Sequence, residues 1–125
     1  YAALVLPALL YACATWAITQ TQMKRLEAFQ QDCLRRIFGI KWYDKISRVQ
    51  VIQIVNSYGV SVLPVEVYIR ERRLRYLGHI ERSGPGRLIY ILLHSQAENG
   101  SRGKGAQVKP YRHCVLDDMK KSEID

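Results

Sequence analysis

Arginine is the residue type in this sequence that is best placed to do chemistry, and it concentrates in one stretch. Four of the six residues from 70 to 75 are arginine. A guanidinium group keeps its charge and binds phosphate oxygens through two parallel hydrogen bonds. Apolar residues recur through the same turns at helical spacing, so we expect a helix that buries one side and presents arginines on the other. The stretch favours phosphate contacts over a solvated surface partly neutralised by Glu66 and Glu71.

The other reactive side chains form no catalytic arrangement. Asp117 and Asp118 are adjacent, and paired carboxylates can hold metal ions. Neighbours on a helix point about 100° apart, however, and Lys120 and Lys121 follow as partners. We therefore expect a solvated helix face here. His79 adjoins the basic helix, but a single histidine is usually bonded locally. We predict no catalytic residue, no metal ligand and no cofactor.

Composition and charge narrow the class of protein. The chain has 125 residues, about one domain, with 48% hydrophobic residues and a formal net charge of +8. Such a charge attracts polyanions. Three cysteines lie far apart, which indicates reduced thiols in an intracellular protein rather than a disulfide framework. The uncharged run from Tyr1 to Ile18 is short for a membrane span, so we expect it in the core of a protein that does not enter a membrane. Because the chain starts inside this run, we expect a fragment of something longer.

Periodicity and capping residues predict an all-α fold of about five helices in an irregular bundle. We expect residues 1–16 to form one helix, or two half-helices bent at Pro7, buried nearly all round. The next helix should start at Thr19 or Thr21 and stop at Gly39, with Phe29 among its core residues. Further helices are expected over 47–59, 64–82 and from 110 onward, while 49–55 keeps a strand as its alternative and 87–94 is either a helix or a strand.

Domain organisation and one aromatic connection complete this picture. We expect a helical domain over 1–95, a flexible basic loop over 96–109 and a C-terminal helix over 110–125. Between Lys41 and Lys45 the adjacent aromatic residues Trp42 and Tyr43 allow stacking on bases or sugars. The commoner role for such a tryptophan is to cover the core, and we expect that role here.

The order of several runs resembles a known family. The runs from Leu10 to Trp16, Arg25 to Trp42, Arg72 to Ile80 and Tyr111 to Lys120 together resemble the region downstream of the polymerase palm in non-LTR (LINE-like) retrotransposon reverse transcriptases. The resemblance covers nearly the whole chain. It implies a thumb and C-terminal segment that holds a template–primer duplex by its backbone. The palm's metal-binding aspartates have no counterpart here, so it implies no catalysis by this chain alone.

The resemblance also implies partners, a location and residue roles. The partners would be the backbone of an RNA or DNA template–primer and the missing upstream palm, with no small-molecule substrate, in the nucleus or cytoplasm. The core would include Trp16, Leu26, Phe29, Leu74 and Leu77. From the arginine pattern and the resemblance together, the predicted nucleic-acid-binding residues are Arg35, Arg36, Arg70, Arg72, Arg73, Arg75, Arg102 and Lys104. Two alternatives stay open: a non-enzymatic helical module that binds another protein, and a retroelement remnant without function.

Overall fold

The computed structural model describes residues 1–95 and 111–122 of the chain. The prediction of an all-α fold is confirmed, because the described residues form helices and no strand. The predicted loop over 96–109, with Arg102 and Lys104, lies outside the described residues. In chain order the elements are α1 (Val5–Leu9), the 3-10 helix η1 (Cys13–Thr15), α2 (Gln20–Phe38), the 3-10 helix η2 (Trp42–Asp44), α3 (Arg48–Ser57), α4 (Val65–Ser83), α5 (Leu88–His94) and α6 (Tyr111–Lys121).

Local capping explains where the second and third helices begin and end. The Thr19 side chain accepts a hydrogen bond from the backbone of α2 in a capping box, and Ser47 does the same for α3. Gly39 ends α2 in the left-handed conformation with φ of 65°, which glycine adopts without strain. These boundaries match the predicted ones, and α3 and α5 resolve the two open alternatives in favour of helix.

The N-terminal segment is less helical and more exposed than expected. Pro7 is the third residue of α1, where a missing backbone N–H breaks no helical hydrogen bond. The chain then turns at Ala12, which has a left-handed φ of 54°, before η1. Leu6 and Leu10 are buried, but Leu4 is exposed. The segment therefore buries one face, not its whole circumference.

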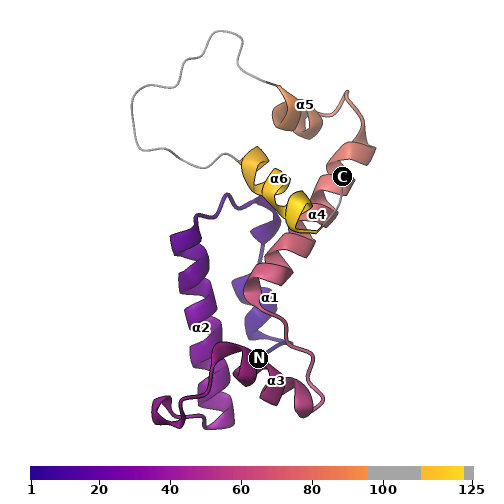
Figure 1. Cartoon of the computed structure of the whole chain (residues 1–125). Coiled ribbons are helices and arrows are strands. Elements are labelled where there is room, and N and C mark those ends of the chain that lie inside the picture. The colour runs from indigo at the N-terminus through magenta and orange to yellow at the C-terminus, as the bar shows by residue number, and fades with distance from the viewer. Residues whose placement is uncertain (96–110, 123–125) are drawn as a thin grey trace.

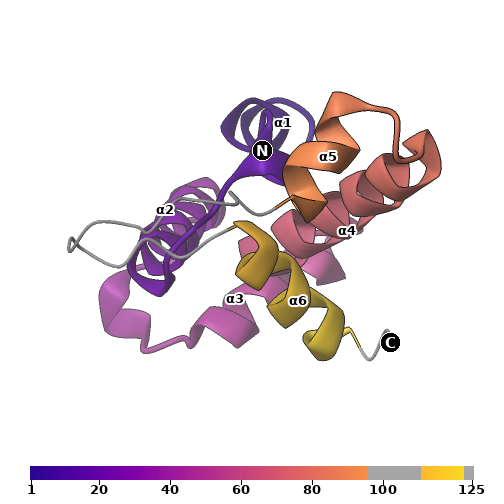
Figure 2. The ribbon, with the colours of Figure 1, turned by 90° about the horizontal axis from the view of Figure 1, so that it is seen from above.

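Helix α4 is the central element of the fold. It runs diagonally between the lower group of α1, α2 and α3 and the upper pair of α5 and α6 (Figure 1). It packs against η1, α2, α5 and α6. Viewed from above, α6 lies beside α4 (Figure 2). The side chains of α4 are therefore shared between contacts to several elements and the solvent.

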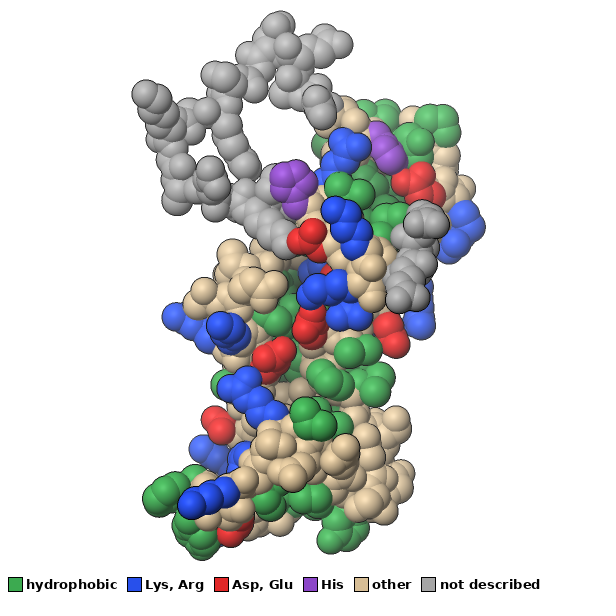
Figure 3. Space-filling view, in the orientation of Figure 1, with side chains coloured by type: hydrophobic (Ala, Val, Ile, Leu, Met, Phe, Trp, Pro, Cys, Tyr) green, Lys and Arg blue, Asp and Glu red, His purple; other side chains and the backbone are tan. Residues whose placement is uncertain are grey.

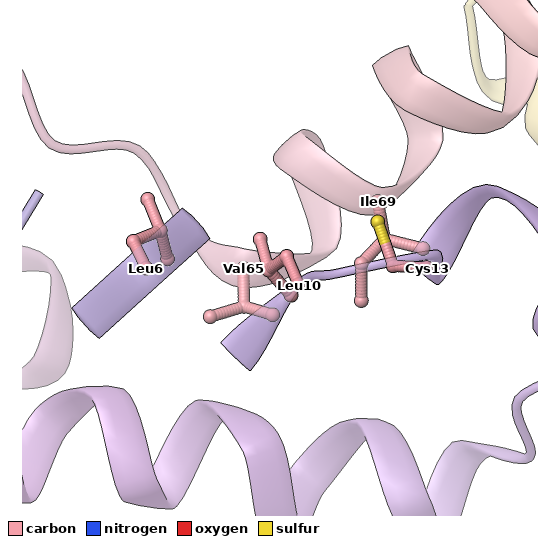
Figure 4. Packing of buried hydrophobic residues seen from close by; sticks show 5 residues of the cluster. All are labelled: Leu6, Leu10, Cys13, Val65 and Ile69. Atoms are coloured by element: carbon pink, nitrogen blue, oxygen red, sulfur yellow. The ribbon is translucent and has the colours of Figure 1, made fainter. Parts of the chain in front are cut away.

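Two hydrophobic clusters hold the lower group together. The first lies between α4 and the α1–η1 segment (Figure 4) and consists of Leu6, Leu10, Cys13, Val65 and Ile69. The second joins α2 and α3 and consists of Leu34, Val51, Val55 and Val62. Phe29 is exposed, which corrects its predicted place in the core, whereas Trp16, Leu26, Leu74 and Leu77 are half-buried.

The buried face of α2 is partly polar, which explains the error at Phe29. Gln30 is fully buried between α2 and the start of α4. Its Nε2 donates to the carbonyl of Leu63 at 2.8 Å, and its Oε1 accepts from the backbone N–H of Val65 at 3.1 Å. The glutamine thereby satisfies backbone groups next to Pro64, which provides no side-chain cap for α4. The buried residues of α2 are Gln30, Gln31 and Leu34, so the inward face of the helix differs from the apolar stripe that includes Phe29.

Candidate nucleic-acid interface

The arginines of α4 have different environments, and Arg73 is part of the core. Its side chain is only 4% exposed, forms an ion pair with Asp118 of α6, and donates through Nη2 to the Trp16 carbonyl at 3.2 Å. Asp118 is also buried, so its predicted place on a solvated helix face is wrong. Arg73 lies one turn from Ile69 and two turns from Ile80, which are both buried, so it points inward on the same face of α4. It fixes α6 to α4 and is not available to phosphate, contrary to the sequence-based prediction.

Arg70 and Arg72 are partly engaged by the protein itself. Arg72 is exposed, but its Nη1 donates to the carbonyl of Leu10 at 3.0 Å. Arg70 pairs with Glu66 on the preceding turn of α4 at 3.3 Å. Glu66 also accepts a hydrogen bond from Lys121 of α6, and this bond, with the positive charges of Lys121 and Arg70, lowers the pKa of the Glu66 carboxyl against the opposing effect of burial.

Arg75 lies on the solvent side of α4 with His79 and Arg82. Their spacing of four and three residues places them on one face of the helix. Within the described residues, neither arginine forms an ion pair. His79, Arg82 and Arg87 also line a hollow of about 420 Å³ at the α4–α5 junction. Of the four α4 arginines predicted to bind phosphate, Arg75 is thus the exposed one that neither forms an ion pair nor donates to a backbone carbonyl within the described residues.

A second basic cluster lies where α2 ends and η2 begins. We call it the α2–η2 corner and define it by Arg36, Lys41, Trp42, Tyr43 and Lys45. All five residues are exposed, Trp42 to 86% and Tyr43 to 61%. The rings of Trp42 and Tyr43 meet edge to face, with centroids 5.9 Å apart and planes at 74°. The prediction that Trp42 covers the core is therefore wrong.

The residues on either side of the aromatic pair explain its exposure. Ile40 and Ile46 pack against the second hydrophobic cluster, so they take the inward positions of this connection. The backbone N–H of Lys41 donates to Asp44 Oδ2 at 2.7 Å, and Lys45 turns the chain with a left-handed φ of 53°. The Arg35 guanidinium donates to the carbonyl of Ile46 and so ties the end of the connection to α2. These contacts hold the turn in place, with the rings of Trp42 and Tyr43 exposed to solvent.

The corner is hollowed and its lining is mostly basic. A cavity of about 360 Å³ opens between the end of α2 and η2. Its charged lining consists of the basic Arg35, Arg36 and Lys41 and the acidic Asp32. The space-filling view shows basic and hydrophobic side chains gathered at the lower left, over the end of α2, while basic and acidic side chains alternate over α4 and α6 (Figure 3). The lining suits an anionic group beside an aromatic surface.

Arg36, predicted from sequence, belongs to the α2–η2 corner, and Arg35, also predicted, lines its hollow. The predicted site lacked the other four residues of the corner, and their only signal in the sequence is two aromatics between two lysines: Lys41, Trp42, Tyr43 and Lys45. The α4 arginines belong to a different part of the structure.

In the part of the chain that the structure describes, no three histidine, cysteine, aspartate or glutamate side chains are grouped so that they could hold a metal ion. No described helix has both the length and the apolar character that crossing a membrane requires. Comparison with protein-family models, curated proteins and solved structures finds no match for this chain.

Proposed function

We propose that this chain binds the phosphate backbone of nucleic acid, as a thumb-like helical segment of a retroelement reverse transcriptase that is not catalytic by itself. The observation that carries the proposal is the α2–η2 corner, where exposed cations and exposed aromatic rings surround a basic hollow. Lysine and arginine neutralise phosphates, and aromatic rings contact bases or sugars.

The distribution of acidic groups supports the proposal. Glu27 pairs with Arg48 at 3.6 Å, Glu81 pairs with His94 at 2.9 Å, and Glu66 and Asp118 hold α6 against α4. These acids are engaged by other residues. Two more acids lie at the corner: Asp44 accepts a hydrogen bond from the backbone N–H of Lys41, and Asp32 lines the hollow with Arg35, Arg36 and Lys41. Arg36, Lys41 and Lys45 form no ion pair with any residue in the described ranges. With a net charge of +8, their field is left for a polyanion.

The identity of the polyanion and of the protein partner comes from the resemblance. The runs from Arg25 to Trp42 and from Arg72 to Ile80, in this order, resemble the segment that follows the palm in LINE-like reverse transcriptases. The proposed ligand is therefore the RNA or DNA template–primer, the proposed protein partner is the upstream palm, and the proposed location is the nucleus or cytoplasm. The corner includes part of the first run, which links the resemblance to the geometry.

Fluorescence anisotropy of a labelled RNA–DNA hybrid, titrated with the full chain at several salt concentrations, tests the proposal. Backbone binding predicts an affinity that falls steeply and log-linearly with salt, with little dependence on base sequence. Circular dichroism shows whether the chain is folded at each salt concentration. A folded chain that fails to bind the hybrid at low salt contradicts the proposal.

A second candidate function rests on a different observation. Leu88 and Leu92 of α5 are 70% and 68% exposed, and Leu4 and Tyr11 are exposed at the N-terminal segment. Exposed apolar side chains of this number favour a helical module that binds another protein. Gel filtration with light scattering over a range of concentrations separates the two: self-association that Leu88→Ser and Leu92→Ser abolish supports the module, and a monomer at every concentration counts against it.

A further inference from the structure

We infer that the α2–η2 corner is a stacking site for an unpaired nucleobase, with Trp42 as its platform and Arg36 and Lys41 beside it for the adjacent phosphate. The inference rests on the proposed function and adds to it a ligand class, single-stranded nucleic acid or an unpaired end next to a duplex. It narrows the aromatic contact of the proposed function to one residue and one mode, the stacking of an unpaired base on Trp42.

The geometry of the aromatic pair leaves ring faces free. In an edge-to-face pair, one ring presents its edge and the other its face, so at most one of the four ring faces is covered. Trp42 is the more exposed of the two residues, at 86%. An indole ring left in water keeps a large apolar surface that a flat partner can cover. A nucleobase is flat, and every base has a π-face.

The charges beside the ring select a nucleotide over a neutral aromatic ligand. Arg36 and Lys41 line the same hollow as Trp42, so an anionic group that follows a stacked base along the chain meets cations. Two acids lie nearby. Asp44 accepts a hydrogen bond from the backbone N–H of Lys41, and Asp32 lines the hollow together with three basic side chains. The corner therefore favours a base with an attached phosphate, and disfavours an acidic peptide that lacks an aromatic side chain.

Hydrogen bonds and packing contacts of the turn preorganise the stacking site before a ligand binds. Three kinds of contact fix the turn that carries Trp42. The Lys41 backbone N–H donates to Asp44, the Arg35 guanidinium donates to the Ile46 carbonyl, and the half-buried Ile40 and Ile46 pack against the second hydrophobic cluster. A fixed platform loses little conformational entropy when a ligand stacks on it. Bases inside a duplex already stack on each other, so an unpaired base is the form that can use the platform.

Tryptophan fluorescence gives a direct test, because the chain contains two tryptophans and the other, Trp16, is half-buried in the core. The full chain is titrated with a thymidine oligonucleotide of about ten nucleotides. The comparator is an abasic oligonucleotide of the same length, which carries the same phosphates without bases. The Trp16→Phe variant isolates the signal of Trp42, and Trp42→Leu removes the platform.

The inference predicts quenching by the thymidine oligonucleotide in the wild type and in Trp16→Phe, and much less by the abasic one. It also predicts that Trp42→Leu binds the thymidine oligonucleotide roughly 5- to 140-fold more weakly, the equivalent of one lost stacking contact. Tyr11→Leu, which removes an equally exposed ring elsewhere, should bind as the wild type does. Circular dichroism checks that both variants are folded.

Two failures are distinguishable. In the first, the wild type binds both oligonucleotides equally tightly, Trp42→Leu does not change the affinity, and binding still depends on salt. This result overturns base stacking and leaves backbone binding in place. Absence of binding to either oligonucleotide and to the hybrid duplex at low salt overturns both proposals. Binding to polyglutamate as tight as to the thymidine oligonucleotide also overturns the inference, because it shows that charge alone selects the ligand.

Discussion

Replacing Arg73 by methionine should destabilise the protein strongly, although the residue lies in a stretch that resembles a surface phosphate site. The change keeps most of the side-chain length and removes the charge. It leaves the carboxylate of Asp118, which is itself only 8% exposed, without its cation. It also removes the donor to the Trp16 carbonyl.

The expected loss is about 3–5 kcal/mol of unfolding free energy, the typical result of breaking a buried ion pair from one side. Total stabilities of domains are about 5–15 kcal/mol, so this loss is a large fraction. Urea unfolding followed by circular dichroism measures it. Arg75→Met is the matched control on the same helix, since Arg75 is exposed and has no ion pair within the described residues, and it should change stability by less than about 0.5 kcal/mol.

A double variant separates the loss of the pair from the loss of packing. Arg73→Met with Asp118→Leu replaces the pair by apolar groups, which is often neutral or stabilising. We expect it to recover most of the stability lost in the single variant. Hydrogen exchange of the α6 amides reports whether Asp118 escapes by undocking of the helix. A single variant that loses less than about 1 kcal/mol while α6 stays protected would refute the assignment of Arg73 to the core.

Three further predictions concern capping and ionisation. Thr19→Ala should lower the unfolding free energy by about 1 kcal/mol in urea, because α2 loses its N-terminal acceptor. Burial raises the pKa of Tyr111 to about 12, and that of Tyr1 to about 12. The unfolded chain therefore loses these protons first, and the unfolding free energy falls as the pH rises from about 10 to about 12. Tyr111→Phe should reduce this fall in an alkaline unfolding series, and an unchanged series would contradict the prediction. The hydrogen bond from Lys121 lowers the pKa of the Glu66 carboxyl. The stability that this ionised carboxylate contributes is therefore present above the ordinary carboxyl pKa, and it is lost as the pH falls through the lowered pKa. Lys121→Ala should weaken the acid dependence of thermal unfolding, and a stronger acid dependence would exclude this bond.

Much of the helical framework could be predicted from sequence because its signals are local. Thr19 and Gly39 mark the ends of α2, and Ser47 marks the start of α3, each through a capping contact within a few residues. The N-terminal segment was harder, since the left-handed turn at Ala12 has no sequence signature. Its exposed face also depends on how far α4 covers it, which is a tertiary property.

The candidate site was less predictable because its members depend on distant partners. Arg73 shares a face of α4 with the apolar Ile69 and Ile80, but its partner Asp118 lies 45 residues further along the chain. The sequence therefore did not show which arginines are engaged. The exposure of Trp42 also depends on tertiary packing. Ile40 and Ile46 take the inward positions of the connection that contains Trp42, because they pack against the cluster that α3 shares.

The measurement that tests backbone binding most directly is the salt slope of hybrid-duplex affinity for a variant that lacks the cations of the α2–η2 corner. The variant carries Arg36→Ala, Lys41→Ala and Lys45→Ala. Its control removes the same net charge elsewhere on the surface through Lys24→Ala, Arg25→Ala and Lys120→Ala. Both variants are checked for folding by circular dichroism, and anisotropy titrations give log Kd against log salt for each.

If the corner holds the backbone, the corner variant should lose up to about 0.9 of slope for each phosphate contact removed, and the control should lose clearly less. Equal slopes for the two variants would mean that the chain attracts nucleic acid only through its overall charge. A slope in the corner variant that equals that of the wild type would contradict the account.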